Sequence, residues 1–372
     1  MSASTVELVR SVAAHGLAGS AAVWPDRPLE AARWSALVAA ADLDRLSGLL
    51  LQAVTDEVLL VTDDQFDQAS ARHVKACCHM LRLESEAVAV LELLTSAGIE
   101  SKVLKGSAVA HLDYPDPSLR VFADVDLLVR SEDVDSAIRV LTASGCARHG
   151  VEPRRGFDRQ FGKGATFTSS SGYEIDLHRT FVMGPYGLRI DLADLWAQPT
   201  HFSLGGLQAG ALDPECRFLH ACFHTALGDR PPRLVAQRDL AQMLLHGNLD
   251  LERVGALMQT WKAEPVVARA VRVTWDNLRI GHVTALSAWA SGYVPRARDI
   301  RELATYGDEA GSSYTALSIA ALAALPSLRA KAVFALSLAA PRRGFVPGQG
   351  TGTGRHRWRR AARALLRQGA VT

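Results

Sequence analysis

Cysteine is scarce in this chain, and its spacing does not suit structural roles. The 372 residues include five cysteines, which form no C-x-x-C pair and no Cys/His set with zinc-site spacing: Cys77, Cys78, Cys146, Cys216 and Cys222. A disulfide scaffold and a structural zinc fold are therefore excluded. This cysteine usage predicts reduced thiols in a cytoplasmic protein.

Neither sign of charge dominates the composition. Lysine and arginine together number 41, and aspartate and glutamate together number 39. The molecule therefore has no overall field that would steer it to nucleic acid or to an anionic membrane surface. Nucleic acid stays possible as a partner but is not indicated by the net charge.

Long hydrophobic runs are also absent. The first twenty or so residues contain no basic leader followed by a continuous apolar stretch, so we expect no secretion signal. The most apolar C-terminal stretch, 314–325, has about half of the roughly 20 residues that a membrane helix needs. We interpret it as a buried helix and expect no membrane partner.

Several common catalytic motifs are missing as well. The sequence contains no G-x-S-x-G and no H-R-D with D-F-G, which excludes the usual hydrolase and protein-kinase patterns. Residues 348–354 are rich in glycine, but no predicted strand precedes them and no G-K-[ST] follows them. We interpret them as a linker.

The spacing of apolar residues divides the chain into four parts. Between residues 31 and 96 apolar residues recur every three or four positions, which is typical of helices, and the same period returns after residue 213. Between these parts, short bounded runs at 99–104, 121–129, 165–168 and 173–178 predict strands. We therefore predict an α+β protein in which a small mixed β-sheet core (98–209) is flanked by N-terminal (1–97) and C-terminal (210–340) helical regions, followed by a flexible linker and basic tail (341–372).

Acidic residues interrupt two of the predicted strands. Because side chains alternate between the two faces of a strand, Asp124 and Asp126 share one face, about 7 Å apart. Asp176 shares its face with Glu174 and His178. Neighbouring carboxylates in a hydrophobic strand are costly unless a cation neutralises them, and carboxylate oxygens suit Mg²⁺. The pattern predicts a divalent-metal site, although an acidic strand edge alone would look similar.

A glycine-serine turn precedes the first acidic strand. Gly106 and Ser107 lie between a predicted strand and a predicted short helix, where backbone N–H groups and a hydroxyl can hold a phosphate. Lys105 and Arg120 are the cations best placed in the sequence to reach phosphate oxygens. Either residue could equally be an ordinary surface charge.

These motifs resemble those of a known superfamily. The segment LKGSAVAHLDYPDPSLRVFADVDLLV followed by EIDLHRTF is similar to the nucleotidyltransferase superfamily that includes DNA polymerase β, and more closely to the bacterial nucleotidyltransferase family 5. The similarity extends to LDPECRFLHACFHTAL and RDLAQML, and so covers about two thirds of the chain. One departure is that 16 residues separate Ser107 from Asp124, more than is usual in the superfamily.

The resemblance implies a reaction and a set of roles. Asp124 and Asp126 would bind Mg²⁺ or Mn²⁺, Asp176 would complete the metal site and act as general base, and Gly106 and Ser107 would hold the phosphates of an NTP such as ATP. The enzyme would move an NMP group to a hydroxyl of an acceptor, which the sequence leaves open between a small molecule, RNA and a peptide. The oligomeric state also stays open.

Two other functions fit the same residues. The metal and phosphate site could deliver a phosphoryl group instead, as in a kinase-like tailoring enzyme of peptide natural-product biosynthesis. The chain could also be a non-catalytic nucleotide-binding module, although the presence of all three carboxylates argues against it.

Three further features have plainer interpretations. His220 and His224 lie four residues apart on a predicted helix, and we expect them to line the cleft beside the sheet rather than to bind zinc. Arg238 and Asp239 are predicted to form a structural pair. The basic segment 355–368 is predicted to be a short helix that is solvated rather than bound to phosphate or lipid.

Overall fold

The computed structural model describes residues 4–228, 231–307 and 314–345. The glycine-rich segment 348–354 and the basic segment 355–368 lie outside the described residues, so their predictions are not tested.

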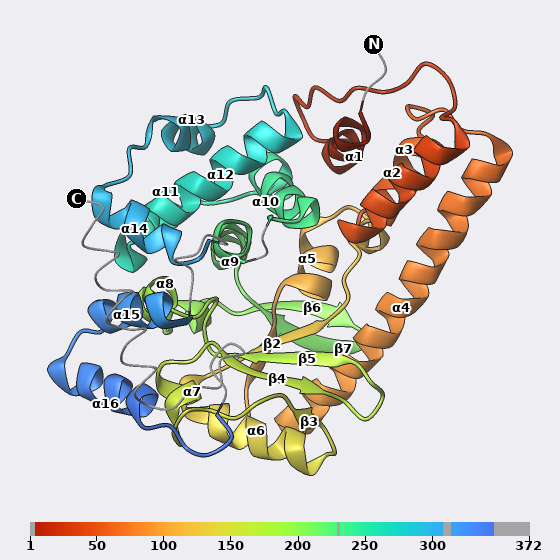
Figure 1. The fold of residues 1–372 in the computed structure, drawn as a ribbon. Coiled ribbons are helices and arrows are strands. Elements are labelled where there is room, and N and C mark those ends of the chain that lie inside the picture. The colour runs from red at the N-terminus through yellow and green to blue at the C-terminus, as the bar shows by residue number, and fades with distance from the viewer. Residues whose placement is uncertain (1–3, 229–230, 308–313, 346–372) are drawn as a thin grey trace.

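A mixed sheet of seven strands forms the centre of the α/β part, in the order β3-β4-β5-β2-β1-β7-β6. The strand β2 lies in the middle, parallel to β5 on one side and antiparallel to β1 on the other. Helices from both ends of the chain surround this sheet (Figure 1). The predicted α+β class is therefore confirmed. The strands are β1 Ser101–Val103, β2 Val125–Val129, β3 Ala147–Arg148, β4 Gly164–Thr168, β5 Glu174–His178, β6 Thr200–Leu204 and β7 Leu207–Ala211.

Helices occupy most of the rest of the described chain. Those before the sheet are α1 Thr5–Ala14, α2 Ala31–Leu43, α3 Ser47–Thr55 and α4 Asp63–Ser96. Those between strands are α5 Lys105–Asp113, α6 Val134–Ala143, α7 Phe157–Gln160 and α8 Pro185–Arg189, with short 3-10 turns at Pro117–Leu119, Ser131–Asp133 and Asp194–Trp196. Those after the sheet are α9 Pro214–Leu227, α10 Leu234–His246, α11 Leu251–Trp261, α12 Glu264–Leu278, α13 Ala285–Gly292, α14 Ala297–Ala304, α15 Tyr314–Ala324 and α16 Leu328–Ala339.

The longest helix, α4, begins at a strong sequence signal. Thr62 accepts a hydrogen bond from the backbone N–H of Gln65, and the Gln65 side chain accepts one from the backbone N–H of Thr62. Asp63 and Asp64 follow in the first turn, where the helix dipole favours negative charge. The C-terminal half of α4 then packs against the sheet through Leu83, Leu91 and their buried neighbours.

The two faces of β2 meet different helices. Val125, Leu127 and Val129 belong to the core shared with α4 and α6, whereas Leu128 belongs to the core shared with α9 and α12. Because side chains alternate along a strand, Asp126 points to the same side as Leu128. The acidic side of the central strand therefore faces the α5 and α9 side of the sheet.

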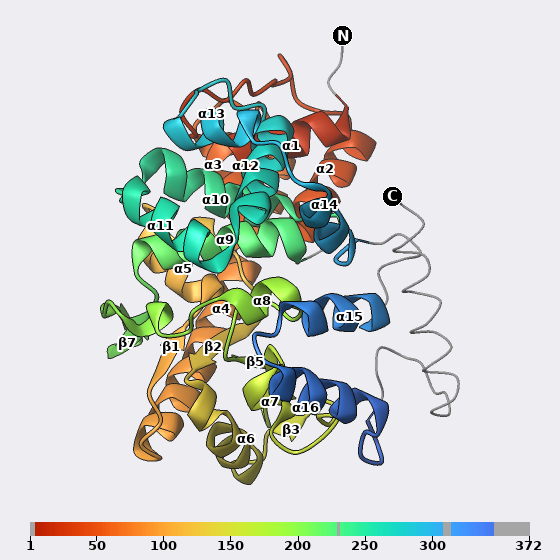
Figure 2. The same ribbon diagram turned by 90° about the vertical axis from the view of Figure 1, so that its left-hand side faces the viewer.

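The helical regions from the two ends of the chain share one core. Leu8, Trp34 and Leu49 from the first three helices pack in a cluster with Leu234 of α10 and Leu278 of α12. Both views show α1 beside α10 and α12 (Figures 1 and 2). This packing holds the loop between α2 and α3 against the α/β part, so that Arg45 of this loop contacts Asp124.

The structure differs from the sequence-based strand predictions at the β6–β7 hairpin and before β2. The hairpin of β6 and β7 was not predicted, yet β7 pairs in parallel with β1 and extends the sheet. Residues 121–124, expected to be strand, are irregular, and β2 starts at Val125.

Where the chain is described, no helix is both long and apolar enough to cross a membrane.

Candidate functional site

Two acidic side chains meet between neighbouring strands. Asp126 of β2 and Asp176 of β5 are direct register partners in the parallel pair. Ligand atoms of Asp126, Asp176 and His178 all lie within 4.8 Å of one another. Asp124 precedes β2 by one residue and is linked to this group through Lys105, whose Nζ lies 2.8 Å from Asp126 Oδ1 and 3.8 Å from Asp124 Oδ2. The structure thus brings the three predicted carboxylates to one place.

Asp126 is the most deeply buried of the three. Its Oδ1 accepts from Lys105 Nζ at 2.8 Å and from His178 Nε2 at 2.7 Å. Its Oδ2 is buried and has no hydrogen-bond partner among the described residues. Burial raises the pKa of Asp126, but Lys105 and His178 outweigh it and hold that pKa well below its usual range. Asp126 is therefore a carboxylate with one oxygen available for a ligand.

His178 supports Asp126 rather than competing for a cation. Because Asp126 is ionised, the short contact requires a proton on His178 Nε2, and we assign that tautomer on this ground. Burial, followed by the nearby Lys163, lowers the pKa of His178, and its Nδ1 has no partner within the described chain. A neutral imidazole that donates to Oδ1 fixes the Asp126 carboxylate and leaves the buried Oδ2 without a partner among the described residues.

Asp176 keeps one oxygen engaged and the other open. Thr166 on the adjacent strand β4 donates its hydroxyl to Asp176 Oδ1 at 2.6 Å. The second oxygen, Oδ2, lies 4.0 Å from His178 Nε2 and 3.8 Å from Lys163 Nζ. The Thr166 bond orients the carboxylate, and Oδ2 is the atom that can accept a proton or bind a cation.

Three cations surround these acids. Lys105 begins α5, Lys163 directly precedes β4, and Arg45 comes from the loop between α2 and α3, with its Nη1 3.5 Å from Asp124 Oδ1. Burial lowers the pKa of Lys105, but Asp126 and Asp124 outweigh it and raise that pKa above its usual value. Burial, followed by the charge of Lys105, lowers the pKa of Lys163.

The turn predicted to bind phosphate, Gly106 and Ser107, lies next to the acidic strand β2. Leu104 N–H donates to the carbonyl oxygen of Asp126 at 2.9 Å, which ties the turn to β2. Gly106 has φ 36° and ψ −116°, a conformation that side-chain-bearing residues rarely adopt. Ser107 follows, buried, at the start of the regular part of α5. Glycine is thus required for the reversal that places Lys105 over the carboxylates.

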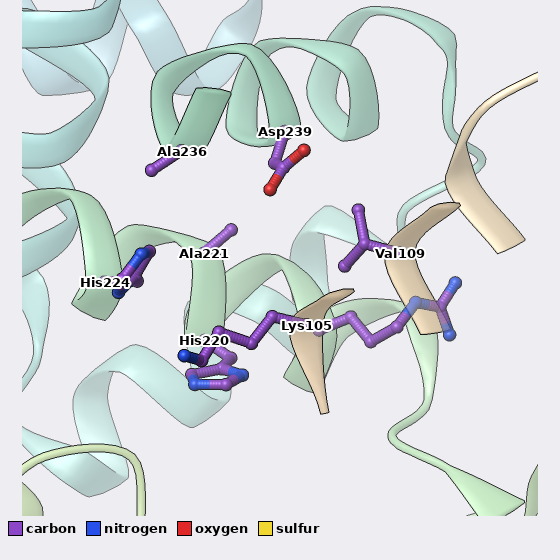
Figure 3. Close-up of a pocket in the computed structure, with 8 residues that line it drawn as sticks. Lys105, Val109, His220, Ala221, His224, Ala236 and Asp239 are labelled. Atoms are coloured by element: carbon purple, nitrogen blue, oxygen red, sulfur yellow. The ribbon is translucent and has the colours of Figure 1, made fainter. Parts of the chain in front are cut away.

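A pocket adjoins the acids on the α9 side. It is a small cavity, in which the centre of a water-sized molecule can occupy only about 10 Å³, and it is lined by α5, α9 and α10 (Figure 3). His220 and His224 both line it, as expected, and His220 stacks on Phe181 with ring centroids 4.5 Å apart. Burial, followed by the charge of Lys105, holds the pKa of both histidines well below its usual range, so both are neutral.

Arg120 is engaged elsewhere. Its Nε and Nη2 donate to the carboxylate of Asp239, the latter to Oδ2 at 2.6 Å, and Tyr114 donates to the same carboxylate at 2.9 Å. The predicted pair of Arg238 with Asp239 is therefore wrong, because Arg238 donates instead to Ala13 O and Gln242 Oε1. Asp239 therefore pairs with Arg120, which follows the 3-10 turn Pro117–Leu119, and not with its neighbour in the sequence.

The chain is similar to proteins of one known family. A model of the family described as uncharacterised nucleotidyltransferase matches residues 30–277. The chain belongs to this nucleotidyltransferase family. A crystal structure of an antigenic nucleotidyltransferase-like protein from Paracoccidioides brasiliensis is similar at 17% identity and a TM-score of 0.30, over 53% of this chain and 92% of that chain. No curated protein gives a significant match.

The region that matches the nucleotidyltransferase family includes all of the site, from Arg45 to Asp239. Sequence reasoning did not single out Arg45 or Lys163, and it named His178 only as sharing a face with Asp176. Arg45 lies 79 residues before Asp124, and no local pattern connects the two. For His178 a signal was present, since it follows Asp176 by two residues and so shares its face.

The donor set fits a hard divalent cation. Asp126 Oδ2 is a buried carboxylate oxygen without a partner in the described structure, and ligand atoms of Asp126, Asp176 and His178 lie within 4.8 Å of one another. Asp124 is connected to this group through Lys105. Oxygen ligands of this kind suit Mg²⁺ or Mn²⁺, with substrate oxygens and water completing the shell. Residues that would hold such a cation are Asp124, Asp126 and Asp176.

Proposed function

We propose that this protein is a metal-dependent nucleotidyltransferase that moves an NMP group from an NTP to a hydroxyl group of an acceptor. One observation carries the proposal. Asp126 is held by His178 and Lys105 through one oxygen, its other, buried oxygen has no partner among the residues that the structure describes, and Asp126 is in register with Asp176 on the neighbouring strand. Membership of a nucleotidyltransferase family supports the same reaction class.

The proposed chemistry assigns a task to each residue. Mg²⁺ or Mn²⁺ bound by Asp124, Asp126 and Asp176 would neutralise the triphosphate and polarise the α-phosphoryl group. Lys105 and the turn at Gly106 and Ser107 would bind phosphate oxygens; the contact of Lys105 with Asp126 supports this assignment. In the transfer, the acceptor oxygen bonds to the α-phosphorus, the bond from that phosphorus to pyrophosphate breaks, and pyrophosphate leaves.

Asp176 takes the proton of the acceptor hydroxyl in this scheme. Its Oδ2 accepts no hydrogen bond shorter than 3.5 Å from the described chain, whereas its Oδ1 is held by Thr166. His178 keeps Asp126 oriented through its Nε2. The buried surroundings of Asp126 limit the access of water, which strengthens each of these electrostatic contacts.

The test is transfer of label from a nucleotide. Each α-labelled NTP is incubated with the protein, Mg²⁺ or Mn²⁺ and fractionated cell extract, and the fraction that takes up label identifies the acceptor. Asp126→Asn is expected to lower the rate on the order of 100-fold or more. Asp135→Asn is the matched control, because this carboxylate lies on α6 and is paired only loosely with Arg159, at 3.8 Å.

The two alternative functions, phosphoryl transfer and non-catalytic nucleotide binding, predict different results in this labelling assay. Uptake of label from the γ position but not from the α position shows phosphoryl transfer, and the acceptor then gains the mass of one phosphate. NTP binding without uptake of either label in any fraction supports a non-catalytic binding module. Both results contradict the proposal.

A further inference from the structure

The three acids of the site are matched by three cations from three separate segments. Lys105 contacts Asp126 and Asp124, Arg45 contacts Asp124, and Lys163 contacts Asp176. None of these contacts is a pair of hydrogen bonds like the one that Arg120 Nε and Nη2 donate to the Asp239 carboxylate. The Arg45, Lys163 and Asp124 contacts lie between 3.5 and 3.8 Å, and only Lys105 reaches Asp126 at 2.8 Å.

Each cation also keeps some access to solvent. The side chains of Arg45, Lys105 and Lys163 are 25%, 17% and 37% exposed, whereas that of Asp126 is fully buried. The side chains of Asp124 and Asp176 are 20% and 19% exposed, so the cations and these two acids are all within reach of a ligand that arrives from solvent. Long, flexible lysine and arginine side chains can change partners there without moving the backbone.

The formal charges of this group sum to zero, with three carboxylates against three cations. A divalent ion added to the carboxylates would lie within a few ångströms of Lys105 and would be repelled by it. A triphosphate carries roughly four negative charges and offers new partners to the displaced cations. Metal and triphosphate together can therefore replace the existing ion pairs, whereas the metal alone meets an opposing charge.

On this basis we infer that Arg45, Lys105 and Lys163 are exchangeable counter-cations, which pair with the carboxylates in the free protein and transfer to the phosphate chain when metal and NTP bind. The inference rests on the proposed function and adds to it which cations leave the carboxylates to bind the phosphate chain. It also assigns Arg45 and Lys163 as phosphate-binding residues in place of Arg120, which Asp239 holds.

The test uses two probes that do not depend on the nucleobase. Binding of Mn²⁺ alone is followed by electron paramagnetic resonance of the free ion, and binding of inorganic tripolyphosphate is followed by calorimetry at a Mg²⁺ concentration that saturates each variant. Lys105→Met and Lys163→Met are expected to bind Mn²⁺ roughly ten-fold more tightly, because a neighbouring like charge is removed. The same variants, and Arg45→Ala, are expected to bind tripolyphosphate roughly ten-fold more weakly.

Opposite changes in the two affinities distinguish exchange from a structural role. A variant that merely loosens the site would weaken both ligands, and that result, or no change in either, overturns the inference. Lys163→Met carries the test if Lys105→Met does not fold, since Lys163 is more exposed. The matched controls are Lys75→Met and Arg139→Ala, both exposed on α4 and α6, and neither should change either affinity.

Failure of the inference can be separated from failure of the proposed function. If the unmodified protein binds both Mn²⁺ and tripolyphosphate but the variants do not show the opposite changes, only the exchange is refuted. If the unmodified protein binds neither probe, the metal and phosphate site itself is refuted, and both proposals fail.

Discussion

Replacing Asp239 with alanine tests whether Arg120 is a structural residue. Asp239 is buried and accepts hydrogen bonds from Tyr114 and from two nitrogens of Arg120, which is itself 3% exposed. Asp239 raises the pKa of Arg120 above its usual value, against the effect of burial. Removing the carboxylate leaves a guanidinium buried without its counter-ion.

The structure sets the size of the effect. Breaking a buried ion pair by deleting one partner costs about 3–5 kcal/mol, because the remaining charge stays desolvated. We therefore expect Asp239→Ala to lower the free energy of unfolding by about 4 kcal/mol, measured by urea denaturation followed by tryptophan fluorescence. The double variant Arg120→Met with Asp239→Leu removes both charges and is expected to recover much of this loss.

A matched exposed pair serves as the control. Arg130 and Glu100 lie 2.8 Å apart, but their side chains are 37% and 59% exposed, so Glu100→Ala should cost less than about 1 kcal/mol. The reasoning is refuted if Asp239→Ala costs no more than Glu100→Ala. It is also refuted if Arg120→Met leaves stability unchanged but weakens tripolyphosphate binding, which would make Arg120 a phosphate ligand.

Three further predictions follow from local geometry. Gly106→Ala should cost about 1–3 kcal/mol in urea unfolding, because φ 36° and ψ −116° strain an alanine although the nearest atoms lie at 3.6 Å or beyond. Leu127→Ala, at a fully buried position of β2, should cost about 2–5 kcal/mol in the same assay. Burial raises the pKa of Asp158 to about 6, and Arg148 opposes the shift. The folded protein then holds a proton that the unfolded chain releases, so the free energy of unfolding should fall as pH rises from about 4 to about 6 and level off above it. Unfolding measured across this range should show no such fall for Asp158→Asn.

Local patterns were enough to predict the two acidic strands. The period-2 alternation predicted that Asp126 faces away from Val125 and Leu127, and the packing of these two residues against α4 and α6 agrees with it. Asp124 lies in the irregular segment before β2, so strand alternation does not describe its position. This works because the alternation is a property of any extended backbone and depends on no distant residue. The match of the family model to residues 30–277 confirms the resemblance to a nucleotidyltransferase family that these motifs predicted.

Pairing between distant segments could not be predicted in the same way. The sheet gains β6 and β7 because β7 pairs with β1, about a hundred residues earlier in the chain. The contact of Arg45 with Asp124 depends on the packing of the first helices against α10 and α12. Such contacts are decided by which surfaces fit together, and no spacing in the sequence records that.

Residue type and strand period were thus enough to predict Asp126 and Asp176 as acids on polar strand faces, since alternation is a local property of an extended backbone. Only the tertiary structure decided that Asp126 stands in register with Asp176, that His178 holds its inner oxygen, and that Arg120 turns to Asp239 rather than to the site. Strand register and the partners of buried charges depend on long-range packing. The local sequence does not distinguish between several possible partners, and packing decides which of them is buried next to the charge.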